Sequence, residues 1–194
     1  MKRVFVVHGW GGHPDEVWFP WLKVELENRG FEVSLLQMPD TGNPKIDKWV
    51  PYLAESVGEV DKDTFFIGHS MGCQAILRYV EALPSDVKVG GAVFVAGFFH
   101  LTGVEKPDEV LIVWPWINNP IDFDKVNART NKFIAIFSDN DVFVPLTNVR
   151  QYEQSIGAKT IVEHNMDHFN GKRNPKYKQV PIILSSVLKI AKAE

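Results

Sequence analysis

The residue pattern best suited to chemistry in this sequence is a serine between two glycines. Residues 65–75 read FFIGHSMGCQA, so an apolar, strand-like run leads into Gly68, Ser70 and Gly72 and then into a helix-like segment. On a sharp turn from a strand to a helix, the missing glycine side chains relieve crowding and the hydroxyl is exposed as a nucleophile. Any corner this tight requires glycine, so the motif gains meaning only if a base and an orienting acid accompany it.

Two aspartates follow a later apolar run and could supply the acid. Residues 133–145 read FIAIFSDNDVFVP, which predicts a buried strand ending near Ser138, with Asp139 and Asp141 at the carboxyl edge where sites of parallel sheets form. Asp141 is the preferred acid because VFVP looks like the short return into a helix that follows it in folds with this serine turn. Asp139 is the alternative, and a pair that merely caps a loop is the structural interpretation.

Two histidines follow the last predicted strand and could supply the base. Residues 160–171 read TIVEHNMDHFNG, and His168 is preferred over His164 because it lies deeper in the loop and can bend back over the sheet edge. A neutral imidazole, the form present above about pH 6.5, can accept the serine proton. With Asp167 these histidines also suggest a metal site, but the segment looks like a loop and lacks further ligands, so no metal is expected.

A glycine-rich loop follows the first predicted strand, where residues 8–12 read HGWGG. The backbone N–H groups of Trp10 and of Met71 are the expected donors to an oxyanion. A phosphate loop is the rival interpretation, but the spacing is not G-x-G-x-x-G, so no nucleotide cofactor is expected. We expect His8 to fix the loop by hydrogen bonds, and the Trp10 side chain either to line the substrate pocket or only to pack.

Two further residues of the serine turn could react but are given structural roles. Cys73 lies on the helix after Ser70 and is expected to be buried and inert, since a catalytic thiol needs a base and an open, electropositive setting. His69 is expected to be packed or hydrogen-bonded and to point away from the chemistry if Ser70 points toward it.

The elements that position these residues follow an alternating pattern. Short apolar runs alternate with segments of three- and four-residue spacing, which predicts an α/β fold with a buried, mostly parallel sheet and helices on both faces. The predicted strands cover residues 4–7, 32–37, 64–68, 92–96, 133–137 and 160–163, and the predicted helices cover 18–29, 46–57, 75–83, 146–156 and 180–191.

One segment, residues 98–131, does not fit the alternation. It contains Trp114 and Trp116 around a proline, and its proline and asparagine content predicts a short, cap-like excursion across the sheet edge. We expect the two tryptophans to shape an apolar substrate pocket. The excursion is too short for a separate domain and no internal repeat is found, so residues 1–194 are predicted to form a single domain.

Length, charge and cysteine content limit the classes of function. A chain of 194 residues can bury a core without disulfides, and its single cysteine rules out an internal one, which favours a reducing cytoplasm. The first apolar run ends too soon for an export signal, and no run approaches the roughly 20 residues of a membrane span. A net charge of −3 argues against nucleic acid as a partner. The basic segment 171–178 is interpreted as a solvated loop.

The motifs HGWGG, GHSMG, SDNDVFVP and DHFNG occur in one order along nearly the whole chain. The chain resembles the α/β-hydrolase superfamily, and more closely the small serine hydrolases of the retinoblastoma-binding-protein and YdeN type. The resemblance implies a three-layer fold reduced to about six strands with a minimal cap, and Ser70, Asp141 and His168 as a catalytic triad. The Leu-x-Cys-x-Glu motif linked to the family's pocket-protein interaction is absent, since Cys73 lies in MGCQA, so that partner is not expected.

We therefore expect a serine hydrolase that cleaves small, uncharged carboxylic esters through an acyl-enzyme intermediate. Family members are credited with ester hydrolysis and in some cases with aminopeptidase activity, and the motifs support the acyl-transfer step that these activities share. Two alternatives stay open. One is an aminopeptidase-like enzyme, which would need a site that grips a free amine, and the other is a non-catalytic interaction module on the hydrolase fold.

Overall fold

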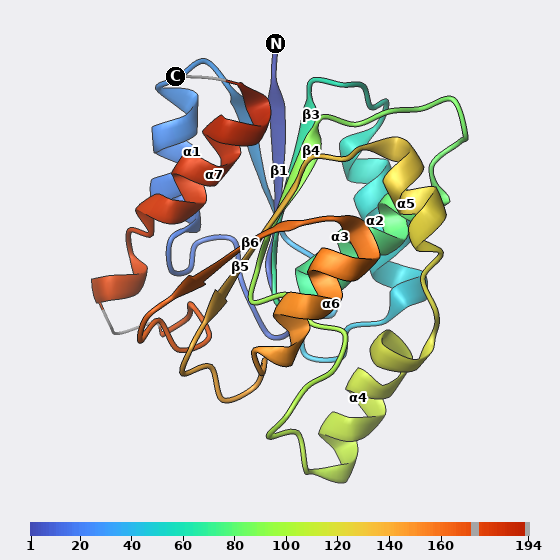
Figure 1. Cartoon of the computed structure of the whole chain (residues 1–194), viewed down its shortest axis with the longest axis vertical. Coiled ribbons are helices and arrows are strands. Elements are labelled where there is room, and N and C mark those ends of the chain that lie inside the picture. Colours follow the sequence, from blue (N-terminus) through green and yellow to red (C-terminus); the bar gives the residue numbers. More distant parts are fainter. Residues whose placement is uncertain (172–174, 193–194) are drawn as a thin grey trace.

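The computed structural model describes residues 1–171 and 175–192, and its described strands form one six-stranded sheet (Figure 1). The strand order is β2-β1-β3-β4-β5-β6, and every neighbouring pair is parallel. This arrangement confirms the predicted fold class, and each strand lies within one residue of its predicted bounds. The strands are β1 (Arg3–Val7), β2 (Glu32–Leu36), β3 (Thr64–His69), β4 (Gly91–Val95), β5 (Phe133–Ser138) and β6 (Lys159–Glu163).

Helices cover both faces of this sheet (Figure 1). α1 and α7 lie together on one face, while α2, α3, α5 and α6 line the other. All residues of the central strands β3, β4 and β5 are therefore buried, whereas the edge strand β6 is partly exposed. The helices are α1 (Phe19–Glu27), α2 (Ile46–Val57), α3 (Met71–Ala82), α4 (Pro107–Asn118), α5 (Phe123–Arg129), α6 (Thr147–Ile156) and α7 (Pro181–Ala191), with a 3-10 turn η1 (Pro175–Tyr177).

Local sequence signals account for several helix ends. Pro20 and Pro181 stand in the first turns of α1 and α7, where a missing N–H costs nothing. Gly157 follows α6 in the left-handed conformation, with φ of 60°, and its N–H bonds back to the helix. Because all the strands are parallel, their carboxyl ends and the loops that follow them lie at one end of the molecule.

The segment 98–131 differs from the predicted excursion. Its second half is the helix α5, which packs against α3 and α6 and so belongs to the helical layer. Only its first half leaves the layers, and α4 projects beyond the carboxyl edge of the sheet (Figure 1). Arg78 holds the end of α4 by donating to the carbonyls of Trp116 and Asn119 at 2.9 and 2.8 Å. The prediction missed both α4 and α5, because each helix has only two buried positions and α5 is only seven residues long, so neither shows a clear apolar periodicity.

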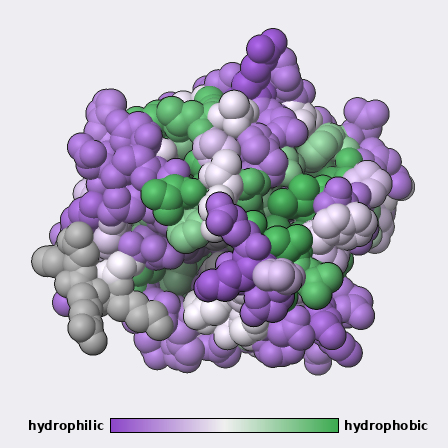
Figure 2. All heavy atoms as spheres, turned by 90° about the horizontal axis from the view of Figure 1, so that it is seen from below, coloured by the Kyte–Doolittle hydropathy of each residue, from purple (hydrophilic) through white to green (hydrophobic). Residues whose placement is uncertain are grey.

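The carboxyl edge of the sheet carries apolar side chains exposed among polar ones (Figure 2). No helix among the described residues is both long and apolar enough to cross a membrane. The exposed large apolar residues of α4 and of the loop after β5 are Val110, Leu111, Trp114, Val142, Phe143 and Leu146.

Candidate active site

Ser70 stands on a strained turn between β3 and α3. Its φ and ψ are 52° and −118°, a region that non-glycine residues rarely adopt and that costs about 1 to 3 kcal/mol. A Cβ on Gly72 would lie 2.2 Å from the carbonyl oxygen of Val7, and one on Gly68 would lie 2.7 Å from the backbone nitrogen of Cys73. The two glycines are therefore required by close packing of α3 against β1 and of the turn against itself.

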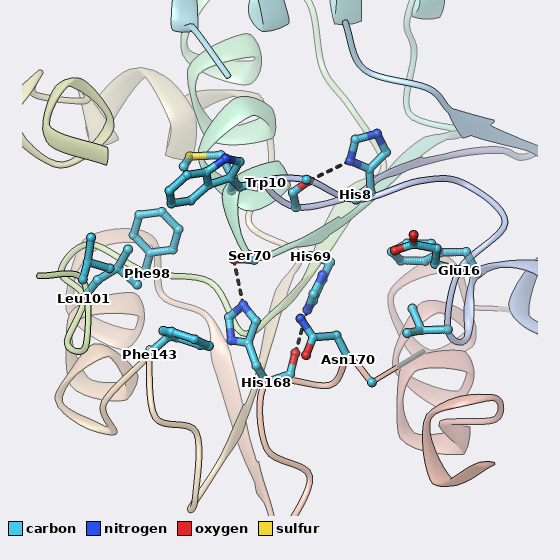
Figure 3. Close-up of a pocket in the computed structure, with 18 of the residues that line it drawn as sticks. His8, Trp10, Glu16, His69, Ser70, Phe98, Leu101, Phe143, His168 and Asn170 are labelled. Atoms are coloured by element: carbon cyan, nitrogen blue, oxygen red, sulfur yellow. Dashed lines mark hydrogen bonds between the residues drawn. The ribbon is translucent and has the colours of Figure 1, made fainter. Parts of the chain in front are cut away.

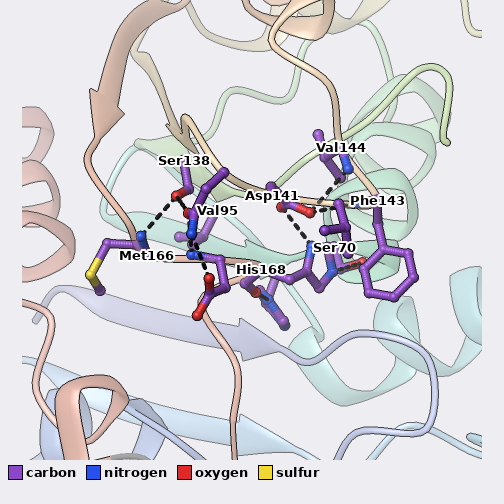
Figure 4. Close-up of polar contacts among 12 residues, drawn as sticks. Ser70, Val95, Ser138, Asp141, Phe143, Val144, Met166 and His168 are labelled. Carbon is purple, nitrogen blue, oxygen red and sulfur yellow. Dashed lines mark hydrogen bonds and ion pairs between the residues drawn. The ribbon is translucent and has the colours of Figure 1, made fainter. Parts of the chain in front are cut away.

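Three predicted residues from separate loops form one hydrogen-bonded chain (Figure 4), of which Figure 3 shows the bond between Ser70 and His168. His168 Nε2 lies 2.9 Å from Ser70 Oγ, and His168 Nδ1 lies 2.7 Å from Asp141 Oδ2. The other oxygen of Asp141 accepts from the N–H groups of Phe143 and Val144, which fixes the carboxylate. With a proton on Nδ1 facing the carboxylate, Nε2 is free to accept from the serine hydroxyl. Their catalytic roles stay a prediction.

The alternative acid and base form a pair of their own. His164 Nδ1 lies 2.6 Å from Asp139 Oδ2, and the N–H of Asn165 donates to the other carboxylate oxygen at 2.8 Å. This hydrogen bond raises the pKa of His164, while the bonds from Asn165 and His164 lower the pKa of Asp139. The structure therefore places Asp139 and His164 apart from Ser70, with the His164 side chain 83% exposed.

The sequence analysis predicted that His69 points away from the candidate site, but the structure shows that it faces the site. It lines the same cavity as Ser70, and its Nε2–H donates to the carbonyl of His168 at 2.8 Å. Burial, and to a smaller extent the charge of His168, lower the pKa of His69 to about 3. The ring packs edge-on against Trp18 and Phe19. The neutral His69 side chain, which lies next to Ser70, thus holds the backbone of His168 by this hydrogen bond.

The loop after β1 is held by His8, as predicted. The N–H of Met38 donates to His8 Nε2 at 3.1 Å, so the ring proton lies on Nδ1 and is donated to the carbonyl of Gly9 at 2.8 Å. Burial lowers the pKa of His8, which favours this neutral form. The loop places Trp10 beside the cavity, and Met71 is the first residue of α3, where an N–H has no partner within the helix.

A cavity of about 570 Å³ opens above Ser70 (Figure 3). Side chains such as Trp10, Phe98 and Phe143 form an apolar wall on one side, whereas Glu16 and Asn170 lie on the opposite side. The Trp10 ring lines the cavity and packs against the core, and its Nε1–H donates to the carbonyl of Gly42 at 3.0 Å. The apolar lining comprises Trp10, Val17, Phe19, Met71, Phe98, Leu101, Val104 and Phe143.

The prediction that Trp114 and Trp116 shape this pocket is wrong, since neither is among its lining residues. The Trp116 side chain is 1% exposed in the core, and its Nε1–H donates to the carbonyl of Pro44 at 3.0 Å. Trp114 lies on the outer face of α4 and is 58% exposed. The aromatic lining that the sequence analysis missed is Phe98 and Phe143, and their signal was their position just after β4 and just after Asp141.

Cys73 is buried, as expected, and the suspected metal ligands are not grouped with further ligands in the described part of the chain. Cys73 is fully buried, its Sγ lies 3.6 Å from the carbonyl of Val95, and burial raises the pKa of the thiol well above its ordinary value. Within residues 1–171 and 175–192, no three His, Cys, Asp or Glu side chains are grouped to hold a metal ion.

A parallel sheet with helices on both faces, and a serine on a tight strand-to-helix turn at its carboxyl edge, define the α/β-hydrolase fold. The family model described as serine hydrolase matches residues 4–187. The chain belongs to this family, as a small serine hydrolase of the YdeN and RBBP9 type.

Similar proteins agree with this assignment. YdeN of Bacillus subtilis (strain 168) is 29% identical over 87% of this chain and 86% of its own length. The serine hydrolase RBBP9 of Rattus norvegicus is 25% identical over 96% of this chain and 95% of its own. The crystal structure of the ydeN gene product superposes with a TM-score of 0.87 at 25% identity, covering 99% of this chain and 100% of that one. Est1E from Butyrivibrio proteoclasticus shares the fold, with a TM-score of 0.74, 12% identity, and coverage of 99% and 87%.

Proposed function

We propose that this serine hydrolase cleaves small, uncharged carboxylic esters through an acyl-enzyme intermediate on Ser70. The observation that carries the proposal is the unbroken hydrogen-bonded chain from Ser70 through His168 to Asp141, which opens on a largely apolar cavity. A hydroxyl is a weak nucleophile alone, and a neighbouring imidazole held by a buried carboxylate removes its proton.

The proposed reaction has two halves. Ser70 Oγ attacks the ester carbonyl while His168 Nε2 takes the hydroxyl proton, and Asp141 stabilises the imidazolium that forms. The N–H groups of Met71 and Trp10 donate to the oxyanion. His168 then gives its proton to the departing alkoxide, which leaves an acyl group on Ser70. In the second half His168 takes a proton from water, the hydroxide attacks the acyl carbon, and the proton returns to Ser70 as the acid leaves.

The cavity favours an ester with an apolar acyl or alcohol group. Phe98, Leu101 and Phe143 form a wall on which hydrocarbon or an aromatic ring can pack, and such burial contributes roughly 25 cal/mol per Å². Est1E, which has the same fold, has been solved with ferulic acid bound, an acid of the kind that ester hydrolysis releases. The proposal therefore places the apolar part of the substrate against this wall.

Steady-state and burst kinetics test the proposal. The purified protein is mixed with p-nitrophenyl acetate and p-nitrophenyl butyrate, and release of nitrophenolate is followed next to the Ser70→Ala variant. We expect turnover, with an initial burst that matches the enzyme concentration if deacylation is slow. Equal rates for the two proteins, or no turnover of either ester, would refute the proposal.

Cleavage next to a free amine is the second candidate, because the cavity also contains two carboxylates. Glu16 and Glu109 both line it, and a substrate ammonium would bind near Glu16 or replace Lys106, whose Nζ lies 2.9 Å from Glu109 Oε1. The comparison is between an aminoacyl ester and its N-acetylated form. If the free amine raises kcat/KM and Glu16→Gln or Glu109→Gln removes the preference, the aminopeptidase-like candidate is supported, whereas equal rates exclude it.

A further inference from the structure

Ser138, the last residue of β5, and the three residues that follow it are each hydrogen-bonded to the loop that carries His168. Figure 4 labels the outer two of these four residues, Ser138 and Asp141, with their partners Met166 and His168. Each of the four side chains accepts a hydrogen bond from that loop. Ser138 Oγ accepts from Met166 N–H at 2.9 Å, Asp139 Oδ1 from Asn165 N–H at 2.8 Å, Asn140 Oδ1 from Asp167 N–H at 2.8 Å, and Asp141 Oδ2 from His168 Nδ1–H at 2.7 Å.

The loop that these bonds hold has a strained backbone. Asn165, Asp167 and Phe169 have φ of 55°, 48° and 52°, so three alternate non-glycine residues lie in the left-handed region. Such conformations cost energy and persist only where the surroundings over-determine them. We therefore expect the loop to relax, and His168 to move, if the bonds from the end of β5 are removed.

Asn140 makes three side-chain hydrogen bonds within this set, as many as the adjacent Asp141 makes in all. Its Oδ1 accepts from Asp167 N–H and from Ser138 Oγ–H, and its Nδ2 donates to Asp167 Oδ1 at 2.6 Å. These bonds fix which way the amide faces. The second oxygen of Asp167 accepts from Lys176 and from the hydroxyl of Tyr177, so the same carboxylate ties the loop to η1.

Neither Asn140 nor Asp167 lines the cavity, so neither is placed to touch a substrate. We propose that Asn140 and Asp167 are positioning residues, whose paired side chains hold the backbone of His168 so that its imidazole stays within reach of the Ser70 hydroxyl. This inference rests on the proposed function of Ser70 and His168. Removing the pair should lower kcat and leave KM nearly unchanged, because substrate contacts are retained.

A reciprocal exchange separates positioning from general stability. Asn140→Asp places two carboxylates about 2.6 Å apart and removes the amide donor, and a displacement of His168 by about 1 Å would lower kcat roughly 100-fold. The double variant Asn140→Asp/Asp167→Asn restores a carboxylate facing an amide, with donor and acceptor reversed, and should recover most of the rate. Asn140→Ala, which adds no charge, should also lower kcat with little change in KM.

The matched control is His164→Ala, which removes another side chain of the same loop without touching the chain from Ser70 to Asp141. We expect its kcat to stay within about twofold of the wild type. All variants are assayed well below their melting temperatures, with the rate of Ser70 labelling by a fluorophosphonate as a second readout that follows nucleophile activation.

The wild-type arm distinguishes the two proposals, since absence of turnover in the wild type refutes the proposed function itself. If the wild type is active, two results would overturn the positioning role. One is unchanged kcat in both Asn140→Asp and Asn140→Ala. The other is a loss of rate in Asn140→Asp that the double variant fails to recover although it is folded.

Discussion

The protein contains two Asp–His pairs on the same two loops, and only one of them meets a serine. In the inner pair, Asp141 to His168, the two atoms are 2.7 Å apart, and in the outer pair, Asp139 to His164, they are 2.6 Å apart. The side chains are 1% and 10% exposed in the inner pair but 34% and 83% exposed in the outer one. Hydrogen-bond length therefore does not distinguish the two pairs, whereas burial and the contact with Ser70 do.

Burial changes what such a pair can do. Water around His164 and Asp139 screens their attraction, so the outer pair contributes little beyond fixing the loop. The inner pair is shielded, and charge that forms on its imidazole is stabilised mainly by the carboxylate beside it. The comparison predicts that matched substitutions in the two pairs will differ in their effect on activity by orders of magnitude.

The largest difference is expected between the two histidines. His168→Ala removes the base and should lower kcat/KM for an activated ester by about 10⁴-fold or more, because the hydroxyl loses its proton acceptor. His164→Ala should change it by no more than about twofold. If kcat/KM fell equally in both variants, the inner pair would have no greater role in catalysis than the outer pair.

A somewhat smaller difference is expected between the two aspartates. Asp141→Asn leaves the amides of Phe143 and Val144 a partner but favours the wrong imidazole tautomer, so kcat should fall by about 10³ to 10⁴-fold. Asp139→Asn should retain activity within a few-fold. Loss of activity in Asp139→Asn with activity kept in Asp141→Asn would reverse the assignment of the acid.

The turn that brings Ser70 to the inner pair can be displaced through Gly72. A Cβ there would meet the carbonyl oxygens of Val7 and His8 at 2.2 and 2.7 Å, and these are backbone atoms that cannot move aside cheaply. Gly72→Ala should lower the free energy of unfolding by about 3 kcal/mol in urea denaturation. Gly42→Ala, where nothing lies within 4 Å, serves as the control, with an expected change below about 0.5 kcal/mol.

The stability contributions of the buried site and of the outer pair should also change with pH in opposite directions. The larger change is expected at the buried site, where His69 lies. His69 has a pKa of about 3 in the folded protein and about 6.5 when unfolded, so below pH 6.5 only the unfolded chain takes up the proton. Its neutral form stabilises the fold above pH 6.5, and this contribution falls by about 1.4 kcal/mol per pH unit below it. Unfolding free energies of wild type and His69→Gln at about pH 7, 6 and 5 should converge as the pH falls, and parallel curves would contradict this.

The outer pair should show the smallest effect, with the opposite sign. The pKa of His164 is raised and that of Asp139 is lowered, so the ion pair stabilises the fold below the ordinary pKa of histidine and above that of aspartate. This contribution is lost as the pH rises through the raised pKa of His164. His164→Ala should therefore lower the melting temperature by about 1 to 2 °C near pH 5.5 and not near pH 9. A difference independent of pH would exclude the ion pair as its cause.

The sequence predicted what depends on local pattern. All six strands were placed within one residue, because apolar runs bounded by turn residues define strands without reference to distant contacts. The residues Ser70, Asp141 and His168 could be found because each lies in the loop or turn that follows a strand, and the carboxyl ends of parallel strands share one edge. The structure brings the three together, as the motif order implied.

What the sequence did not predict depends on contacts between distant residues. The direction of Trp116 follows from the rotation of α4 against Pro44, a residue 72 positions earlier, and no local pattern reports such a rotation. His69 faces the cavity because its ring finds the carbonyl of His168, 99 positions later. The bonds from Asn140 to the His168 loop likewise join residues that are 27 positions apart, so no local sequence pattern indicates them.

The central claim is that Ser70 is a nucleophile activated by the inner pair and not by the outer one. The most direct test treats the wild type, His168→Ala and His164→Ala with a fluorophosphonate probe between about pH 6 and 9 and locates the adduct by mass spectrometry. We predict an adduct on Ser70 in the wild type and in His164→Ala, and none in His168→Ala. An adduct on another residue, no adduct in the wild type, or loss of labelling in His164→Ala with labelling kept in His168→Ala would contradict the claim.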